Sequence, residues 1–179
     1  MAFLSSFRAG QETAYPESLR DQLRAFPLLR EVSDAAFRRL LGEANWFCLP
    51  GGTVLERDGE NERALFLVVT GSLGVFVEDT HGQRRLVADV PAGETVGEMS
   101  LVSGDSPSAQ LVALRDSELL RVSPAAFDML IARHPRVMLN LLRIVVKRLL
   151  DTTHGIALRG VVQRSEEHTS ELQSQSNLV

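Results

Sequence analysis

The sequence predicts a mainly β protein: an antiparallel β-roll of the double-stranded jelly-roll type, flanked by N-terminal helices and by C-terminal hinge and long helices. Short strand-like runs alternate with glycine-rich turns through the middle of the chain. The spacing of these runs suits an antiparallel sandwich or barrel better than a βαβ sheet. Helical periodicity appears only at the two ends. We therefore expect the roll to extend from about Asn45 to Ser123.

Two helices are expected before the roll. Residues 17–30, with the sequence ESLRDQLRAFPLLR, have the pattern of a short amphipathic helix that Pro27 breaks. A second helix is expected to begin at Ser33, a favourable N-cap residue that is followed by Asp34 in the first turn. This second helix carries three large apolar side chains on one face: Phe37, Leu40 and Leu41.

The roll itself is predicted from seven short runs: WFCLP, TVLERDG, ALFLVVTG, LGVFVED, RRLVADV, AQLVAL and ELLRVS. The turn sequences PGG, DGEN, TGS, THGQ and PAGE separate these runs. The segment EDTHGQRR is a good hairpin connection, because Gly82 has no side chain and is free to take a positive φ.

Helices return after the roll. Ser123 is a favourable cap, and Pro124 fits the first position of a helix through AAFDMLIARH. Pro135 then breaks the chain and starts a longer helix, RVMLNLLRIVVKRLLDTT, for which Gly155 is a plausible terminator.

The longer helix has one predicted polar stripe, since Arg136, Asn140, Arg143 and Lys147 recur at helical spacing. Most other positions are apolar, including Leu142, Val145, Val146 and Leu149. The roll covers only part of such a surface, so the remainder either forms a homodimer helix, meets a downstream domain, or lies in a groove of its own domain. Periodicity does not separate these alternatives.

Composition narrows the function classes. The chain has 179 residues with 44% hydrophobic content, enough for one well-buried domain and a small appendage. A formal net charge of −4 argues against nucleic acid or anionic lipid as the main partner. The single cysteine, Cys48, excludes an intrachain disulfide framework and a multi-thiolate metal site. It suits a reducing compartment, and with no signal peptide or transmembrane run evident we expect a cytoplasmic location.

No catalytic or metal constellation is predicted. His81, His134 and His154 lack metal-ligand spacing to one another, so we expect no metal and no resident cofactor. A jelly-roll metal enzyme of the cupin type would need histidines and acids clustered on neighbouring strands. This sequence lacks such a cluster, so this interpretation is the least favoured. Trp46 and Phe47 are expected to be core or helix-packing residues, and Cys48 is expected to be inert.

The stretch GETVGEMSLVSGDSPSAQ, residues 93–110, is the candidate ligand site. Gly97 would let a ligand approach the backbone, and EMSLV has the composition of one helical turn whose free N–H groups point at an anion. Glu98 would repel a phosphate but would accept hydrogen bonds from ribose hydroxyls. The pattern fits a sugar-phosphate pocket. It also fits a simple connection in which Glu98 only favours a helix N-terminus, and that alternative stays open.

Three ordered segments resemble the cyclic-nucleotide-binding domain shared by the catabolite activator protein, protein kinase A regulatory subunits and cyclic-nucleotide-gated channels. They are LPGGTVLERDGENERALFLVVTGSLGVF, PAGETVGEMSLVSGDSPSAQLVAL and DSELLRVSPAAFDMLIARHP, within about Phe26 to Asp151. The resemblance implies that Glu98 binds the ribose hydroxyl of a cyclic nucleotide. It also implies that backbone N–H groups of the following turn bind the phosphate, which places the site at Gly97, Glu98, Met99, Ser100, Leu101, Pro107, Ser108 and Ala109.

The sequence departs from the family pattern at one position. The resemblance implies an arginine near SPSA, where this chain has Pro107, or Ser108 if the loop shifts by one residue. Proline offers neither charge nor N–H, and serine offers only a neutral hydroxyl. A charge-assisted hydrogen bond contributes about 1.5–3 kcal/mol, against about 1 kcal/mol for a neutral one. Cyclic AMP or cyclic GMP is therefore expected to be a weak ligand at most.

The segment VGEMSLVSGDSPSAQLVALRDSELLRVS is similar in sequence to part of the domains that lie upstream of the esterase unit in bacterial patatin-like phospholipases, the relatives of neuropathy target esterase. The resemblance implies a regulatory domain that controls a downstream esterase. This chain itself has no Gly-x-Ser-x-Gly elbow, so we expect it not to be an enzyme. The alternative is the sensor domain of a catabolite-activator-type transcription regulator, truncated before its helix-turn-helix; neither reading implies direct nucleic-acid contact by this fragment.

The expected domain organisation has four parts. Residues 1–25 form an N-terminal extension, residues 26–155 the cyclic-nucleotide-binding-like domain, and residues 156–163 the start of a linker to a missing downstream domain. Residues 164–179 resemble the in-frame translation of a common sequencing-library adapter, through RSEEHTSELQS and the final QSNLV. We expect this tail not to be native and to contribute nothing to the core.

Overall fold

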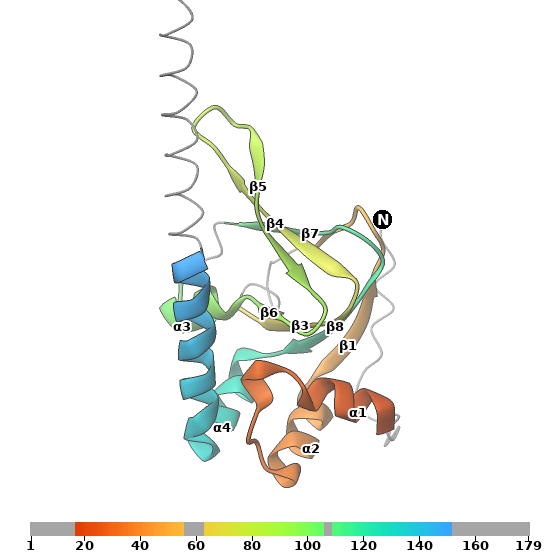
Figure 1. The fold of residues 1–179 in the computed structure, drawn as a ribbon, viewed down its shortest axis with the longest axis vertical. Coiled ribbons are helices and arrows are strands. Elements are labelled where there is room, and N and C mark those ends of the chain that lie inside the picture. The colour runs from red at the N-terminus through yellow and green to blue at the C-terminus, as the bar shows by residue number, and fades with distance from the viewer. Residues whose placement is uncertain (1–16, 56–62, 106–108, 152–179) are drawn as a thin grey trace, which may run out of the picture. The chain divides into compact units, whose positions relative to one another are not determined.

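The structure is a computed structural model that describes residues 17–55, 63–105 and 109–151 (Figure 1). Two four-stranded antiparallel sheets form a β-roll with helices on both sides in sequence. The first sheet has the order β1-β8-β3-β6 and the second the order β2-β7-β4-β5. The strands are β1 (Asn45–Leu49), β2 (Val54–Leu55), β3 (Leu65–Thr70), β4 (Ser72–Glu78), β5 (Arg84–Pro91), β6 (Thr95–Val96), β7 (Gln110–Ala113) and β8 (Ser117–Val122).

The predicted fold class is therefore confirmed. All seven strand-like runs contribute a strand, and the first and last strands, β1 and β8, lie side by side in one sheet. The strand β6 was not predicted, because its two residues carry no apolar run of their own. The predicted tail and linker, with Gly155 and His154, lie outside the described residues.

Phe66 of β3 is fully buried and belongs to the apolar core that strands of both sheets form. Its ring meets that of Phe47 on β1 edge to face, with centroids 6.1 Å apart and planes at 82°. The expectation that Phe47 packs in the core is thus confirmed, whereas Cys48, one residue later, is exposed, as strand alternation requires. Strand β3 is buried from Leu65 to Val69, so both of its faces are covered.

The N-terminal helices follow the prediction, with one short helix in addition. Helix α1 (Glu17–Arg24) ends before Pro27, and Pro27 instead begins a short 3-10 helix, η1 (Pro27–Leu29). Helix α2 (Asp34–Glu43) begins as predicted, with the Ser33 hydroxyl accepting a hydrogen bond from the Ala36 N–H at 3.4 Å. Its three predicted apolar residues are all buried: Phe37, Leu40 and Leu41.

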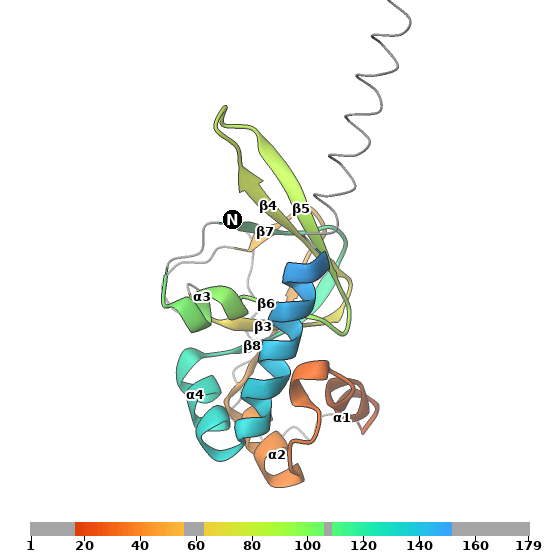
Figure 2. The same ribbon diagram turned by 60° about the vertical axis from the view of Figure 1, so that its left-hand side comes forward.

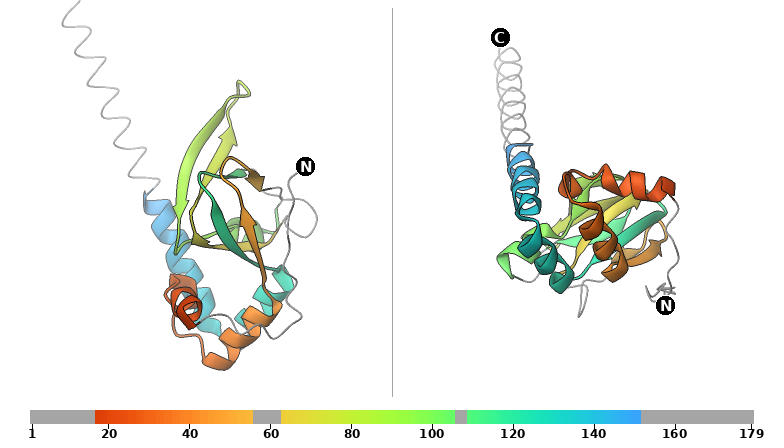
Figure 3. Two further views of the ribbon diagram at one scale, coloured as in Figure 1. Left: turned by 90° about the vertical axis from the view of Figure 1, so that its right-hand side faces the viewer. Right: turned by 90° about the horizontal axis from the view of Figure 1, so that it is seen from below.

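The hairpin between β4 and β5 extends away from the end of the roll where α2 and α4 lie (Figures 2 and 3). Gly82 has a φ of 74° in its turn, as the sequence predicted. The Asp79 carboxylate accepts backbone N–H bonds from His81 and Gln83, both at 2.9 Å. These two hydrogen bonds stabilise the turn that connects β4 and β5.

Helix α4 (Pro124–Arg133) begins as predicted: the Ser123 hydroxyl accepts from the Ala126 N–H at 3.2 Å, and Pro124 occupies the first turn. The chain is again helical over residues 135–151. The chain divides into two compact units, Met1–Leu141 and Leu142–Val179.

The predicted polar stripe of the last helix includes one buried residue. Asn140 is buried, with 4% of its surface exposed, beside the buried Val137 and Leu141. Its side-chain amide donates to the backbone carbonyls of Leu28 and Arg30 at the end of η1. Helical spacing places Asn140 on the polar stripe but does not show that it is buried. Its amide supplies the donor for the buried Leu28 carbonyl and the partly buried Arg30 carbonyl.

Candidate functional site

The candidate loop contains a short helix, α3 (Glu98–Ser103), held between two glycines. Gly97 at its N-terminus has a φ of 98° and Gly104 at its C-terminus a φ of 77°, conformations that side chains disfavour. The Leu101 N–H donates to the Gly97 carbonyl at 3.2 Å, and the Gly104 N–H to the Ser100 carbonyl at 3.1 Å. The predicted helical turn is therefore confirmed. The positive φ of Gly97 favours glycine at this position, and its predicted role in letting a ligand approach the backbone stays a prediction.

The side chains of α3 divide sharply between the interior and solvent. Glu98 is 2% exposed and Ser100 is 7% exposed, whereas Met99 is 71% exposed and Val102 is 60% exposed. A buried carboxylate in the first turn of a helix is favoured by the helix dipole. The Oε2 atom of Glu98 is buried without a hydrogen bond of its own, although the side chain takes part in other interactions.

Strand β6 fixes the position of α3 against the first sheet. It pairs with β3, with Val96 opposite Phe66 and Thr95 opposite Leu67. The turn before it is tied to the same strand, since the Val68 N–H donates to the Glu94 carbonyl and the Gly93 N–H to the Val68 carbonyl, both at 2.9 Å. Glu98 thus begins a helix that follows directly from a strand anchored in the core.

The candidate residues therefore fall into two groups. Gly97, Glu98, Met99, Ser100 and Leu101 lie together at the start of α3. Ala109 is half-buried just before β7, while Pro107 and Ser108 lie outside the described residues. The roles assigned to all of these residues in ligand binding stay predictions.

Arg115 is the first arginine after the loop in sequence, and its side chain is hydrogen-bonded to the start of β4. Its Nε donates to the Ser72 hydroxyl at 3.0 Å. The Ser117 hydroxyl in turn donates to the Arg115 carbonyl at 2.8 Å. This contact joins the β7–β8 turn to the start of β4. Sequence reasoning did not find it, because nothing local links residues 43 positions apart.

The proposed dimer helix exposes most of its named apolar residues. Leu142 is 57% exposed, Val146 is 45% exposed and Leu149 is 65% exposed, while Val145 is half-buried. Large apolar side chains at this exposure along one helix are available for contact with another molecule.

Neither a metal-binding cluster nor a membrane-spanning helix is found in the part of the chain that the structure describes. No group of three or more His, Cys, Asp and Glu residues there is arranged to hold a metal ion. No helix among those residues is long and apolar enough to cross a membrane.

Comparisons with known proteins agree with this geometry. Residues 47–134 match the family model described as cyclic nucleotide-binding domain. The chain is 28% identical over 123 residues to lysophospholipase nte1 of Aspergillus terreus, covering 69% of this chain and 8% of that protein. It is 25% identical over 171 residues to lysophospholipase NTE1 of Saccharomyces cerevisiae, covering 89% of this chain and 10% of that protein. The chain thus spans a tenth or less of these curated relatives.

Solved structures give the same fold. The catabolite activator protein of Thermus thermophilus superposes with a TM-score of 0.64 at 30% identity, covering 75% of this chain and 63% of that chain. The regulatory domain of Toxoplasma gondii PKA with cAMP superposes with a TM-score of 0.60 at 20% identity, covering 68% of this chain and 46% of that chain. The second likeness concerns the fold alone.

Proposed function

Because the chain belongs to the cyclic nucleotide-binding domain family through residues 47–134, we propose that it is a regulatory domain whose α3 loop binds a cyclic nucleotide weakly. The observation that carries this proposal is the buried Glu98 at the start of α3, directly after the left-handed Gly97. A carboxylate held in this position is suited to accept hydrogen bonds from the hydroxyl of a ribose.

The phosphate would be bound by the backbone. The first N–H groups of a helix have no partner within the helix, and they favour an anion. At the start of α3 these groups belong to Glu98, Met99 and Ser100. The negative charge of Glu98 opposes a phosphate nearby, so a site of this kind needs a compensating cation for high affinity.

The expected cation is missing from the sequence, since Pro107 and Ser108 stand where the family resemblance implies an arginine. With one charge-assisted bond of about 1.5–3 kcal/mol absent, affinity should be roughly ten- to a hundredfold below that of an arginine-bearing site. We therefore propose a site that binds cyclic nucleotides with low affinity.

Titration calorimetry with cyclic AMP and cyclic GMP tests the site. The wild type should bind weakly, and Pro107→Arg or Ser108→Arg should bind roughly ten- to a hundredfold more tightly. Gln83→Arg adds the same charge to the β4–β5 turn and serves as the matched control, with no expected gain. Tight binding by the wild type with no gain from either arginine would show that another group supplies the positive charge.

The output of the domain is proposed to be a downstream patatin-like esterase. The similarity to two lysophospholipases over most of this chain supports the link, and the matched segment is a small part of those proteins. The continuous natural gene past Gln163 tests it. A Gly-x-Ser-x-Gly elbow is expected there, and a helix-turn-helix would overturn the assignment.

A sensor domain of a transcription regulator is the second candidate. The 30% identity to the catabolite activator protein of Thermus thermophilus favours it. The described fold serves both outputs equally, so the same downstream sequence separates the two candidates.

The last helix is proposed to form a homodimer through the exposed Leu142, Val146 and Leu149 together with Val145. Light scattering over a concentration series should show a dimer that the triple change of Leu142, Val146 and Leu149 to Glu converts to a monomer. Changing the exposed Arg38, Asp105 and Asp128 to Ala is a control that should leave the mass unchanged. A wild type that stays monomeric at every concentration would remove this proposal.

A further inference from the structure

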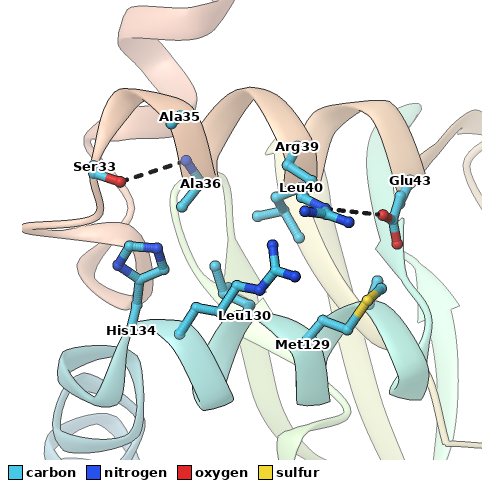
Figure 4. A pocket seen from close by; sticks show the side chains of 11 residues that line it. Ser33, Ala35, Ala36, Arg39, Leu40, Glu43, Met129, Leu130 and His134 are labelled. Carbon is cyan, nitrogen blue, oxygen red and sulfur yellow. Dashed lines mark hydrogen bonds and ion pairs between the residues drawn. The ribbon is translucent and has the colours of Figure 1, made fainter.

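A second concave site lies between α2 and α4, formed by residues that the proposed cyclic-nucleotide site does not use. It is a pocket of about 190 Å³. The two helices run antiparallel across it, so that Ser33 lies opposite His134 and Glu43 opposite Met129 (Figure 4). The pocket therefore belongs to the helical end of the domain.

The floor of this α2–α4 pocket is apolar. Leu40 and Leu130, exposed by 4% and 6%, form its base. Ala36 leaves space because its side chain is a single methyl group, and Met129, 37% exposed, borders that space. A methionine side chain is flexible and polarisable, so this wall adapts to the shape of an apolar chain.

The charges around the pocket do not cancel. Arg39 and Glu43 form an ion pair with 3.6 Å between Nε and Oε1, one turn apart on α2. Arg133 also lines the pocket, and no carboxylate among the residues that the structure describes pairs with it. The lining therefore carries two guanidinium groups and one carboxylate, an excess of one positive charge.

An apolar floor beside one uncompensated guanidinium is complementary to a small molecule with one negative charge and one apolar chain. The guanidinium of Arg133 offers a planar fork of donors that matches a carboxylate. No Phe, Tyr or Trp side chain is among the described residues that line the pocket; the one ring there is the imidazole of His134 at its edge. The volume suits a short chain and not a large cofactor.

We propose that the α2–α4 pocket binds an amphiphilic monoanion, a carboxylate with a short unbranched acyl chain. The Arg133 guanidinium pairs with the carboxylate, and the acyl chain lies on Leu40, Leu130 and Met129. The residues that line this pocket are all different from those of the α3 loop, so the two sites can be tested with separate variants.

Nuclear magnetic resonance titration of the full 179-residue chain with octanoate, acetate and octanol tests the proposal. Octanoate should give saturable shift changes centred on Ala36, Leu40, Met129 and Leu130. Acetate, which lacks the chain, and octanol, which lacks the charge, should each bind at least about tenfold more weakly. Equal affinity for octanoate and octanol, or shift changes elsewhere only, would overturn the assignment. Non-saturable shifts would show binding at high concentration only and would also overturn it.

Two single variants test whether the Arg133 guanidinium supplies the charge that binds the carboxylate. Arg133→Met should weaken octanoate binding roughly tenfold, because it removes the charge and keeps an apolar stem of similar length. Arg38→Met is the matched control: Arg38 is an exposed arginine of α2 that does not line the pocket, and it should leave binding unchanged. Equal weakening by both variants would assign the effect to general surface charge and contradict the proposal. Thermal unfolding of each variant confirms that the pocket is still folded.

Discussion

The buried side chain of Asn140 is hydrogen-bonded to the backbone of Arg30, 110 positions earlier in the chain, with 2.9 Å between Nδ2 and the carbonyl oxygen. The same amide donates to the Leu28 carbonyl at 3.3 Å. One asparagine therefore satisfies two carbonyls at the end of η1, where no helix continues to satisfy them. This contact ties the N-terminal helical segment to the start of the last helix.

Replacing this asparagine should therefore destabilise the domain. Asn140→Leu leaves the Leu28 and Arg30 carbonyls without this donor, and we expect a loss of about 1–3 kcal/mol in the free energy of unfolding. For a chain of this size that corresponds to a fall of several degrees in the thermal midpoint. The control is Arg136→Leu, which breaks an exposed ion pair with Glu31 at 3.5 Å and should cost at most about 1 kcal/mol. Equal midpoints for the two variants would show that the amide contacts contribute nothing.

Two glycines with similar backbone conformations should respond differently to the same substitution. Gly71 has a φ of 81° and Gly93 a φ of 90°, so alanine is strained at both positions. A methyl group at Gly71 would collide with the Ser117 hydroxyl and the Asp116 carbonyl, and would lie 2.7 Å from the Ser117 Cα. At Gly93 it would meet nothing within 4 Å.

Gly93→Ala should therefore cost only the backbone strain, about 1 kcal/mol. Gly71→Ala should cost clearly more, about 3 kcal/mol or above, because the turn into β4 has to move. Thermal or urea unfolding of both variants measures the difference. Similar losses would mean that the β3–β4 turn relaxes freely around an added side chain.

The Asp79 carboxyl should titrate at an unusually low pH. The backbone N–H of Gln83, and then that of His81, donate to its carboxylate and hold its pKa below the ordinary value of 3.8. A depressed folded-state pKa stabilises the hairpin above pH 3.8, and this contribution is lost as the pH falls through the folded-state value. Carbon-detected nuclear magnetic resonance of the Asp79 carboxyl should give a midpoint below 3.8. A midpoint at or above that value would show that the turn bonds do not persist in solution.

Much of the roll was predictable because its signals are local. Gly82 and the turn glycines mark strand ends, and Ser123 with Pro124 marks a helix start, each through the conformation of a few adjacent residues. The short strand β6 was missed because it has no apolar run of its own and its pairing with β3 depends on a distant segment, as Val96 opposite Phe66, 30 positions earlier, illustrates.

The environment of single polar residues was harder to predict. Periodicity treats Asn140 as one more position of the polar stripe. In the structure it is buried and donates hydrogen bonds to two backbone carbonyls far away in sequence. Similarly, Arg115 reaches Ser72 only because β7 pairs with β4. The α3 turn itself was predicted from the composition of EMSLV, whereas the burial of Glu98 depends on how β6 enters the first sheet.

The role proposed for Glu98 is tested most sharply where binding is strong enough to measure. On the Ser108→Arg background, Glu98→Ala should lower the affinity for cyclic AMP roughly tenfold or more, because it removes a charged acceptor for the ribose hydroxyl. Met99→Ala changes the next residue of the same helix, whose side chain is 71% exposed, and should alter the affinity less than about threefold.

Thermal unfolding separates binding from stability in this pair. Replacing the buried Glu98 removes both a helix-dipole interaction and buried contacts, so the thermal midpoint of each variant establishes that the domain is folded at the temperature of the titration. A cyclic nucleotide lacking the ribose 2′-hydroxyl should bind the Ser108→Arg protein and its Glu98→Ala derivative with similar affinity, since the acceptor then has no donor to bind. If Glu98→Ala weakens both nucleotides equally, the carboxylate acts by shaping the loop and not by holding the ribose.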